Sequence, residues 1–102
     1  MLVHWCIVRA DLPRGVQAAM LIHAAGESSP GALPKGTHAV ALAAEDETHL
    51  LLLERRLIFE RIPHAAIREP DPPYCGALMA IGLPPLSREM QPNLLKKLSL
   101  LE

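Results

Sequence analysis

The chain has 102 residues, of which 50% are hydrophobic, and its ten basic and eleven acidic residues leave a formal net charge of −1. This length supports a single domain with one core, covering residues 1–102. The near-neutral charge argues against strong non-specific binding to nucleic acids, which needs a basic surface. The two cysteines, the lack of a signal segment and the lack of a long apolar run predict a cytoplasmic protein that does not span a membrane.

The first two elements are predicted to be a strand and a helix. Residues 2–9 form a short apolar run that is rich in strand-forming residues. An Ala-rich helix is expected from about residue 13 to residue 25, with Gly26 as its C-terminal stop. Asp11 is expected to cap the start of this helix.

The middle of the chain predicts a loop, a strand and a second helix. Residues 27–36 have the Gly, Pro and Ser content of a surface loop. Residues 38–44 read as a strand, and Asp46 then precedes a helix over residues 47–61. The apolar stripe of this helix is expected to consist of Leu50, Leu53, Leu57 and Ile58.

The last part of the chain predicts two strands and a helix. Residues 64–68 form a third strand, and residues 69–74 form a stiff loop that contains three prolines. Residues 77–82 form a fourth strand. Residues 87–97 are expected to form a last helix, which Pro92 shortens or kinks.

Strands that alternate with helices are typical of a mostly parallel sheet that is covered on both faces. The short connection between the third and fourth strands favours a hairpin-like pairing, so we expect a mixed sheet. The predicted fold class is α/β, a single-domain three-layer α/β/α sandwich with about four strands.

Polar residues that follow the strands are the candidates for chemistry. Arg9 and Asp11 lie at a strand end, where open α/β sheets form their ligand crevices. Arg9 can contact a phosphate or carboxylate there, or the two residues can form only a cap and a surface ion pair. Glu69 and Asp71 flank a proline, so they can orient a water molecule or a hydroxyl, or form a solvated acidic turn.

Two further side chains have both a functional and a structural interpretation. His23 lies on an apolar face of the first helix, where a histidine is either a general base or a satisfied core residue. Tyr74 can stack on a base or cover the core. No metal site is predicted, because the five histidines share no ligand spacing. No phosphate-binding glycine motif is present, and no cofactor is expected.

Several segments together resemble a known family. Residues 8–12 read Val-Arg-Ala-Asp-Leu, Gly15 supplies a turn, and residues 18–24 read Ala-Ala-Met-Leu-Ile-His-Ala. Residues 79–85 read Met-Ala-Ile-Gly-Leu-Pro-Pro, and residues 98–101 read Leu-Ser-Leu-Leu. The chain is similar, over its whole length, to the type 2 peptidyl-tRNA hydrolases. Its Glu-Pro-Asp loop resembles a divergent bacterial branch of that family.

The resemblance implies hydrolysis of the ester that joins a peptide to tRNA, by a protein that forms a homodimer. It implies catalytic roles for Asp11, His23, Glu69 and Asp71. It implies substrate-binding roles for Arg9, Arg14, Gly15, Gln17 and Tyr74. In this interpretation Arg9 contacts the tRNA backbone, and His23 with an acidic residue positions the attacking water. Helix N–H groups stabilise the oxyanion.

Two alternatives stay open. The first is a non-catalytic module on the same fold that binds protein or RNA. Met20 replaces the family's helix glutamine, and the family's lysine is absent, which favours this alternative. An enzyme is expected to show Arg9, Glu69 and Asp71 converging in the crevice, whereas a binding module fills it with Met20 and Met79. The second alternative is a small-molecule pocket with a reactive Cys75.

Overall fold

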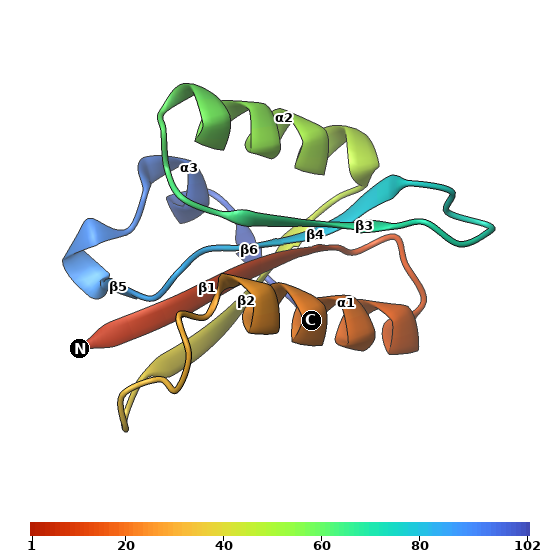
Figure 1. Cartoon of the computed structure of the whole chain (residues 1–102). Helices are drawn as coiled ribbons and strands as arrows, with labels where there is room; N and C mark the ends of the chain where they lie inside the picture. Colours follow the sequence, from red (N-terminus) through yellow and green to blue (C-terminus); the bar gives the residue numbers. More distant parts are fainter.

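The computed structural model describes residues 1–102 and contains both helices and strands, shown in Figure 1. The elements are β1 (Leu2–Arg9), α1 (Arg14–Ser28), β2 (His38–Ala44), α2 (Glu47–Phe59), β3 (Ala65–Glu69), β4 (Ala77–Gly82), β5 (Leu86–Ser87), the 3-10 helix η1 (Arg88–Met90), α3 (Asn93–Lys96) and β6 (Ser99–Leu100). The α/β class and the mixed sheet are confirmed. None of the helices is long and apolar enough to cross a membrane.

The sheet has six strands, in the order β3-β4-β1-β2-β6, with β5 also paired to β1. About four strands were expected, and the two additional ones, β5 and β6, have two residues each. The expectation of a mostly parallel sheet is wrong, because only β1 and β2 pair in parallel. The strands β1, β2 and β3 do run in one direction, but β4 lies between β3 and β1 and is antiparallel to both.

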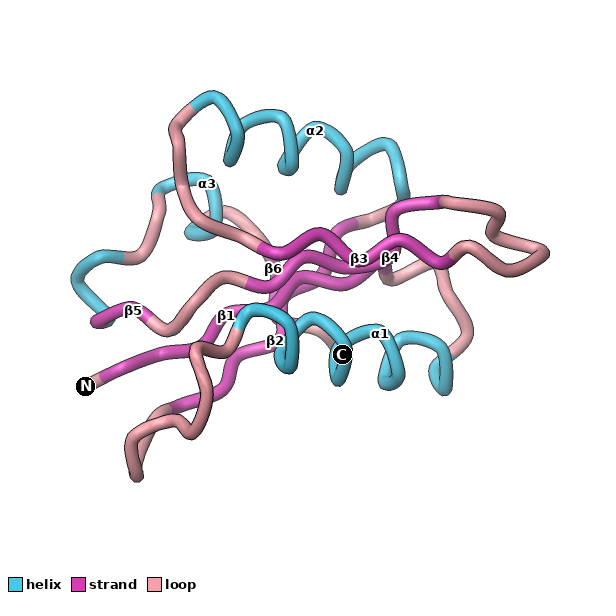
Figure 2. Tube along the Cα trace, in the orientation of Figure 1, coloured by secondary structure: helices cyan, strands magenta, loops and turns pink.

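The helices lie on opposite faces of the sheet, with α1 on one side and α2 and α3 on the other (Figures 1 and 2). The side chains of β1 alternate between the two faces. Val3, Trp5 and Ile7 join a core with residues of α2 and α3. Cys6 and Val8 join a second core with residues of α1. Burial of this strand on both faces explains why its sequence is a continuous apolar run.

Helix α1 continues past the expected stop at Gly26 and ends at Ser28. Gly26 does not adopt the positive φ of a helix-ending glycine. Ser29 is instead extended, with φ −81° and ψ 135°. The next residue is Pro30, and a residue before proline is pushed out of the helical region by the proline ring. The proline therefore ends this helix.

Helix α2 ends at Phe59, two residues before the expected end. Arg61 follows in the left-handed region with φ 57°. The Arg61 amide donates to the Ile58 carbonyl, and the Ile62 amide donates to the Leu57 carbonyl at 2.9 Å. This is the Schellman arrangement, which satisfies the last carbonyl groups of a helix.

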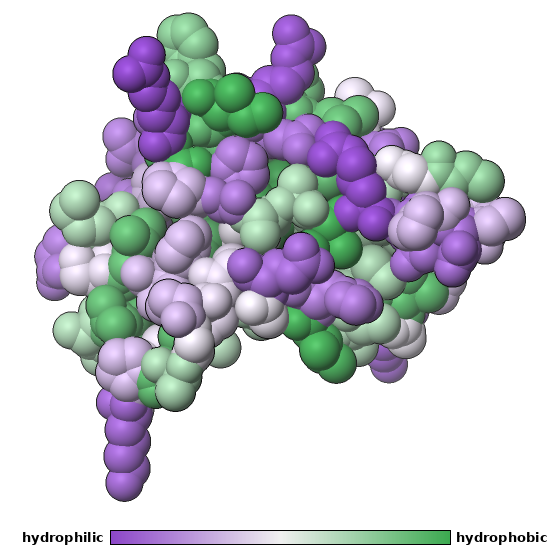
Figure 3. Space-filling model, in the orientation of Figure 1, coloured by the Kyte–Doolittle hydropathy of each residue, from purple (hydrophilic) through white to green (hydrophobic).

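The start of α2 and most of its buried stripe follow the expectation. Asp46 caps the helix by accepting the His49 amide at 2.9 Å. Leu50, Leu53 and Leu57 are buried, but Ile58 is 61% exposed, so its assignment to the stripe is wrong. Ile58 is the residue after Leu57 and points about 100° away from it around the helix. Figure 3 shows green apolar atoms between purple side chains at the top of the molecule, over α2.

The strands of the hairpin agree with the predicted ranges, and the C-terminal helix does not. β4 has the expected bounds, and β3 is shifted by one residue. The predicted helix over residues 87–97 is replaced by β5, η1 and the short α3. Gln91 and Pro92 have ψ values of 124° and 140°, which interrupt any helix there. Pro92 lacks the amide donor and excludes the helical conformation from Gln91.

Two close contacts join α1 to the sheet beneath it. His4 Nε2 lies 2.8 Å from Ser28 Oγ, and Ser28 Oγ donates to the Ala24 carbonyl at 2.6 Å. Both residues are buried. At Gly82 of β4, an added Cβ would lie 2.5 Å from Ser28 Oγ and closer still to the Ala24 carbonyl oxygen. The helix can approach β4 this closely only because residue 82 has no side chain.

Replacing this glycine is expected to weaken the fold. Gly82→Ala should lower the free energy of unfolding by about 1–3 kcal/mol, because the new methyl group must push the α1 backbone away. Gly26→Ala is the matched control, since nothing lies within 4 Å of a Cβ at that helical position. It should raise the stability by about 0.5–1 kcal/mol. Denaturant unfolding measures both, and equal effects would contradict the packing argument.

The buried His4 should make stability dependent on pH. Burial lowers the pKa of His4 from its ordinary value of 6.5. The unfolded chain therefore binds this proton more readily, and the contribution to stability is complete above pH 6.5 and lost as the pH falls from there to the folded-state pKa. In thermal unfolding between about pH 8 and pH 5, His4→Phe should lose less stability than the unsubstituted protein. Identical pH profiles would contradict this assignment.

Candidate functional site

The candidate residues gather at one edge of the sheet. β1, β2 and β3 run in the same direction, so their carboxyl ends share this edge with the start of β4 (Figure 2). Arg9 and Asp11 follow β1, and Glu69 ends β3. Both α1 and α2 begin here as well, at Arg14 and Glu47. The polar residues expected at the carboxyl ends of strands therefore do lie along one edge of the sheet.

Arg9 forms a two-point ion pair with Asp11. Its Nε and Nη2 atoms donate to the two carboxylate oxygens of Asp11 at 3.0 and 2.9 Å. The hydrogen bond to Arg9 holds the pKa of Asp11 below its ordinary range, and the same bond raises the pKa of Arg9. With its carboxylate turned to Arg9, Asp11 does not cap α1, whose N-cap residue is Pro13. The predicted capping role is wrong for this reason.

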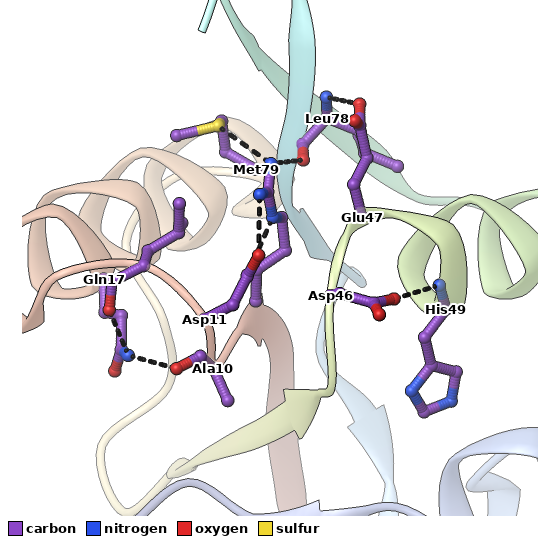
Figure 4. A network of polar contacts seen from close by, with 10 residues as sticks. Ala10, Asp11, Gln17, Asp46, Glu47, His49, Leu78 and Met79 are labelled. Carbon is purple, nitrogen blue, oxygen red and sulfur yellow. Dashed lines mark hydrogen bonds and ion pairs between the residues drawn. The ribbon is translucent and has the colours of Figure 1, made fainter. Parts of the chain in front are cut away.

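The remaining edge of the Arg9 guanidinium contacts β4. Nη1 donates to the Leu78 carbonyl oxygen at 3.2 Å and lies 3.8 Å from Met79 Sδ (Figure 4). The Arg9 side chain is only 12% exposed. All edges of the guanidinium therefore have protein partners, and the structure gives Arg9 a positioning role at the base of the site.

Glu47 binds the other backbone polar group of the same residue of β4. Its Oε2 atom accepts the Leu78 amide at 2.8 Å, so Leu78 is held through its N–H by Glu47 and through its C=O by Arg9 (Figure 4). Backbone pairing of β1 with β4 stops at Val8 and Ala80. We call Arg9, Glu47 and Leu78 the strand-end clamp, because two side chains take over where backbone pairing stops.

The sequence analysis did not identify this role of Glu47. The only signal was an acidic residue in the first turn of a helix, where such residues interact favourably with the helix dipole. That general preference explains why an acidic residue stands at this position, and it gives no indication that Glu47 also binds a strand. The contact spans 31 positions in the sequence, so no local pattern could have indicated it.

Gln17 supports the turn between β1 and α1. Its Nε2 atom donates to the Ala10 carbonyl at 3.1 Å and to the Leu12 carbonyl at 2.8 Å. Both carbonyl groups belong to the segment between β1 and α1. Gln17, which was predicted to bind substrate, is therefore hydrogen-bonded within the protein. Arg14, predicted for the same role, is exposed, and its side chain has no ion-pair or hydrogen-bond partner.

A cavity of about 250 Å³ lies between the start of α1 and the loop that follows β3. Its helical wall is formed by Gly15, Val16, Ala19 and Met20, and its loop wall by Glu69, Asp71, Pro72 and Tyr74. Four of the predicted site residues therefore line one cavity: Gly15, and, more than 50 positions later in the sequence, Glu69, Asp71 and Tyr74.

The loop wall is organised by its own hydrogen bonds. Glu69 Oε1 accepts the Asp71 amide at 3.1 Å. The Asp71 carbonyl accepts the amides of Tyr74 and Cys75 at 3.0 and 3.1 Å. The Asp71 carboxylate is exposed and makes no hydrogen bond within the protein. Both acidic side chains consequently retain carboxylate oxygens that can accept a proton or hold a water molecule.

The structure does not bring every candidate into the cavity. His23 lies one turn beyond Ala19 on α1, is exposed, and is not part of the cavity wall. Arg9, Asp11 and Cys75 also lie outside the wall. Met20 does line the cavity, as expected for the binding-module alternative, but Met79 contacts Arg9 instead.

A second cavity of similar size lies elsewhere and contains none of the candidates. It has a volume of about 260 Å³ and is found between α2 and α3, next to His49, Arg56 and Lys97. Nowhere in the chain do three or more His, Cys, Asp or Glu residues form a group that could hold a metal ion. We call the cavity between the start of α1 and the loop after β3 the α1 cavity. It is the candidate functional site because four predicted site residues line it.

The α1 cavity lies between the start of a helix and a loop that carries two carboxylates. The first helical hydrogen bond of α1 runs from the Gln17 amide to the Pro13 carbonyl, so the preceding amides have no partner within the helix. No side chain caps this end and no acidic residue lies in its first turn. Unpaired amides of this kind can bind an anion or a developing oxyanion, and the carboxylates stand on the opposite wall.

The strand-end clamp can be tested through stability. Glu47→Leu should lower the free energy of unfolding by about 1–3 kcal/mol, because it leaves the Leu78 amide without an acceptor. Glu47→Gln should have a smaller effect, since the amide oxygen of glutamine can still accept that bond. Chemical denaturation of both variants measures the difference. A glutamine variant as unstable as the leucine variant would contradict the hydrogen-bonding role.

Comparison with known proteins finds no protein-family model and no curated protein that matches this chain.

Proposed function

We propose that the chain hydrolyses the ester bond between a peptide, or another N-acylated aminoacyl group, and tRNA. The observation that carries the proposal is the arrangement of one cavity of about 250 Å³. The uncapped start of α1 forms one wall, and the loop with Glu69 and Asp71 forms the other. The sequence resemblance described above supplies the reaction class. The proposed cellular setting is the cytoplasm, and the proposed assembly is a homodimer with a three-layer α/β/α protomer.

The proposed reaction uses groups from both walls of the cavity. The substrate ester carbonyl is bound near Gly15, with its oxygen toward the unpaired amides of α1. A water molecule held by Glu69 and Asp71 attacks the carbonyl carbon, and one carboxylate accepts the water proton. The α1 amides stabilise the negative charge that forms on the carbonyl oxygen. The ester C–O bond then breaks, and the ribose oxygen leaves with that proton.

We propose different tasks for the two arginines at this edge. Arg9 is engaged by Asp11 and Leu78, so it fixes the start of β4 and the turn before α1. Arg14 lies beside Gly15, is exposed and has no partner. We therefore give the phosphate contact, which the sequence analysis placed on Arg9, to Arg14. His23, one helical turn beyond the cavity, contacts the part of the substrate that extends past it.

A non-catalytic binding module on the same fold is the second candidate function. The presence of Met20 in the cavity wall and the absence of Arg9 from it favour this alternative. The same surface would then hold the acylated end of tRNA, or a protein segment, without cleaving it. Turnover and binding must therefore be measured separately.

The test is the release of N-acetylamino acid from N-acetylaminoacyl-tRNA by the purified protein. Glu69→Gln and Asp71→Asn together should lower kcat by about 10²–10⁴-fold, the range for loss of a general base. Glu27→Gln is the matched control, because Glu27 is an exposed acid on α1 outside the cavity. Circular dichroism should show that all variants remain folded.

Arg14→Ala should raise KM by about 10–100-fold with kcat little changed, because one hydrogen bond to a charged group contributes about 1.5–3 kcal/mol. Wild-type protein that binds the substrate without releasing product would favour the binding module. Unchanged turnover in the doubly substituted protein would overturn the roles of Glu69 and Asp71.

A further inference from the structure

A separate cavity lies under the C-terminal half of α1, away from the proposed active site. It has a volume of about 190 Å³ and is lined by β1, β2 and α1. Most of its wall is apolar and includes Leu21, Ala25 and Ala41. β1 contributes His4 and Cys6, which pair in register with two alanines of β2. The small side chains of β2 leave space here that a larger residue would fill.

His4 is the one wall residue with nitrogen atoms in its side chain, and it is only 4% exposed. Its Nε2 atom lies 2.8 Å from Ser28 Oγ. The single hydroxyl proton of Ser28 is already donated to the Ala24 carbonyl, which can only accept. Ser28 must therefore accept from His4, so Nε2 carries the proton of the neutral ring and Nδ1 carries a lone pair.

The lone pair of Nδ1 has no partner within the protein. The one hydrogen bond of the His4 ring is at Nε2, so Nδ1 has no partner. Every fully buried side-chain nitrogen and oxygen in the chain does have a partner, which means that Nδ1 is not fully buried. Nδ1 must consequently be the part of His4 that is reached from outside the protein, and the cavity is where His4 meets open space. Burial lowers the pKa of His4, which keeps the ring neutral and Nδ1 an acceptor at neutral pH.

We propose that this cavity binds a small, neutral, mostly apolar molecule that donates one hydrogen bond to His4 Nδ1. The apolar wall would strip water from a charged group without pairing it, so an ion is disfavoured. A metal is disfavoured too, because Cys6 and His4 are only two ligands, and burial raises the pKa of the Cys6 thiol to about 11. An apolar protein cavity of about 150 Å³ holds benzene, so 190 Å³ accommodates a phenol-sized molecule.

Phenol and anisole form the matched pair of probes, since both have an aromatic ring and an oxygen but only phenol has a donor. In calorimetric titrations phenol should bind about threefold to tenfold more tightly than anisole, the range for one neutral hydrogen bond of about 0.5–1.5 kcal/mol. In ¹⁵N NMR spectra, phenol should shift the Nδ1 resonance of His4 while Nε2 keeps its protonated signature. Anisole should leave the Nδ1 resonance in place.

Two variants distinguish the contribution of the His4 hydrogen bond to binding from that of the cavity volume. His4→Phe keeps a ring but removes both nitrogen atoms, so phenol should lose its advantage over anisole. Ala41→Leu fills the cavity and keeps His4, so neither probe should bind. Ala32→Leu, in the exposed loop between α1 and β2, should leave both affinities unchanged.

The measurements on the unsubstituted protein decide the proposal even if His4→Phe does not fold. Equal affinity for phenol and anisole, an unmoved Nδ1 resonance, or no binding of phenol at millimolar concentration would each overturn it. The proposal does not depend on ester hydrolysis, because the two cavities share no residue.

Discussion

β4 lies between β3 and β1 and runs antiparallel to both, although it is the last of the four long strands in the sequence. This position buries almost the whole strand. It also requires α1 to come very close to the sheet at Gly82, where no side chain fits. At the other end of β4, backbone pairing with β1 has stopped, and the polar groups of Leu78 are paired by Arg9 and Glu47 instead.

The sequence predicts elements well where the signal is local. β1, β2 and β4 are short apolar runs bounded by polar or proline-rich segments, and their ranges follow from that contrast. Helix ends were predicted less well, because they depend on single backbone conformations. Pro30 rather than Gly26 ends α1, and Arg61 takes the left-handed conformation that a glycine usually has. The sheet order was out of reach, because the insertion of β4 depends on contacts between distant segments.

The sequence predicted which residues lie near one another better than it predicted their contacts. Polar residues after β1 and β3 do share one edge of the sheet, and the loop with Glu69 and Asp71 does meet the start of α1. The partner of Asp11 could not be chosen from the sequence, because a helix amide and the Arg9 guanidinium both suit a carboxylate. The structure selects Arg9, and the start of α1 is left uncapped as a result. An unsatisfied helix end is costly in a purely structural element, and here it borders a cavity.

Helix α1 forms part of the wall of two cavities. Its first turns line the cavity of Glu69 and Asp71, and its later turns line the cavity of His4. A helix of this kind moves largely as one body, since its backbone hydrogen bonds resist internal bending. A molecule bound under one half can affect the other half only if it moves the helix relative to the sheet. Thermodynamic linkage makes any such influence mutual, so that occupancy of either cavity adjusts the affinity of the other by the same factor. Helix α1 is thus the one element that borders both cavities, and any coupling between their occupants would act through it.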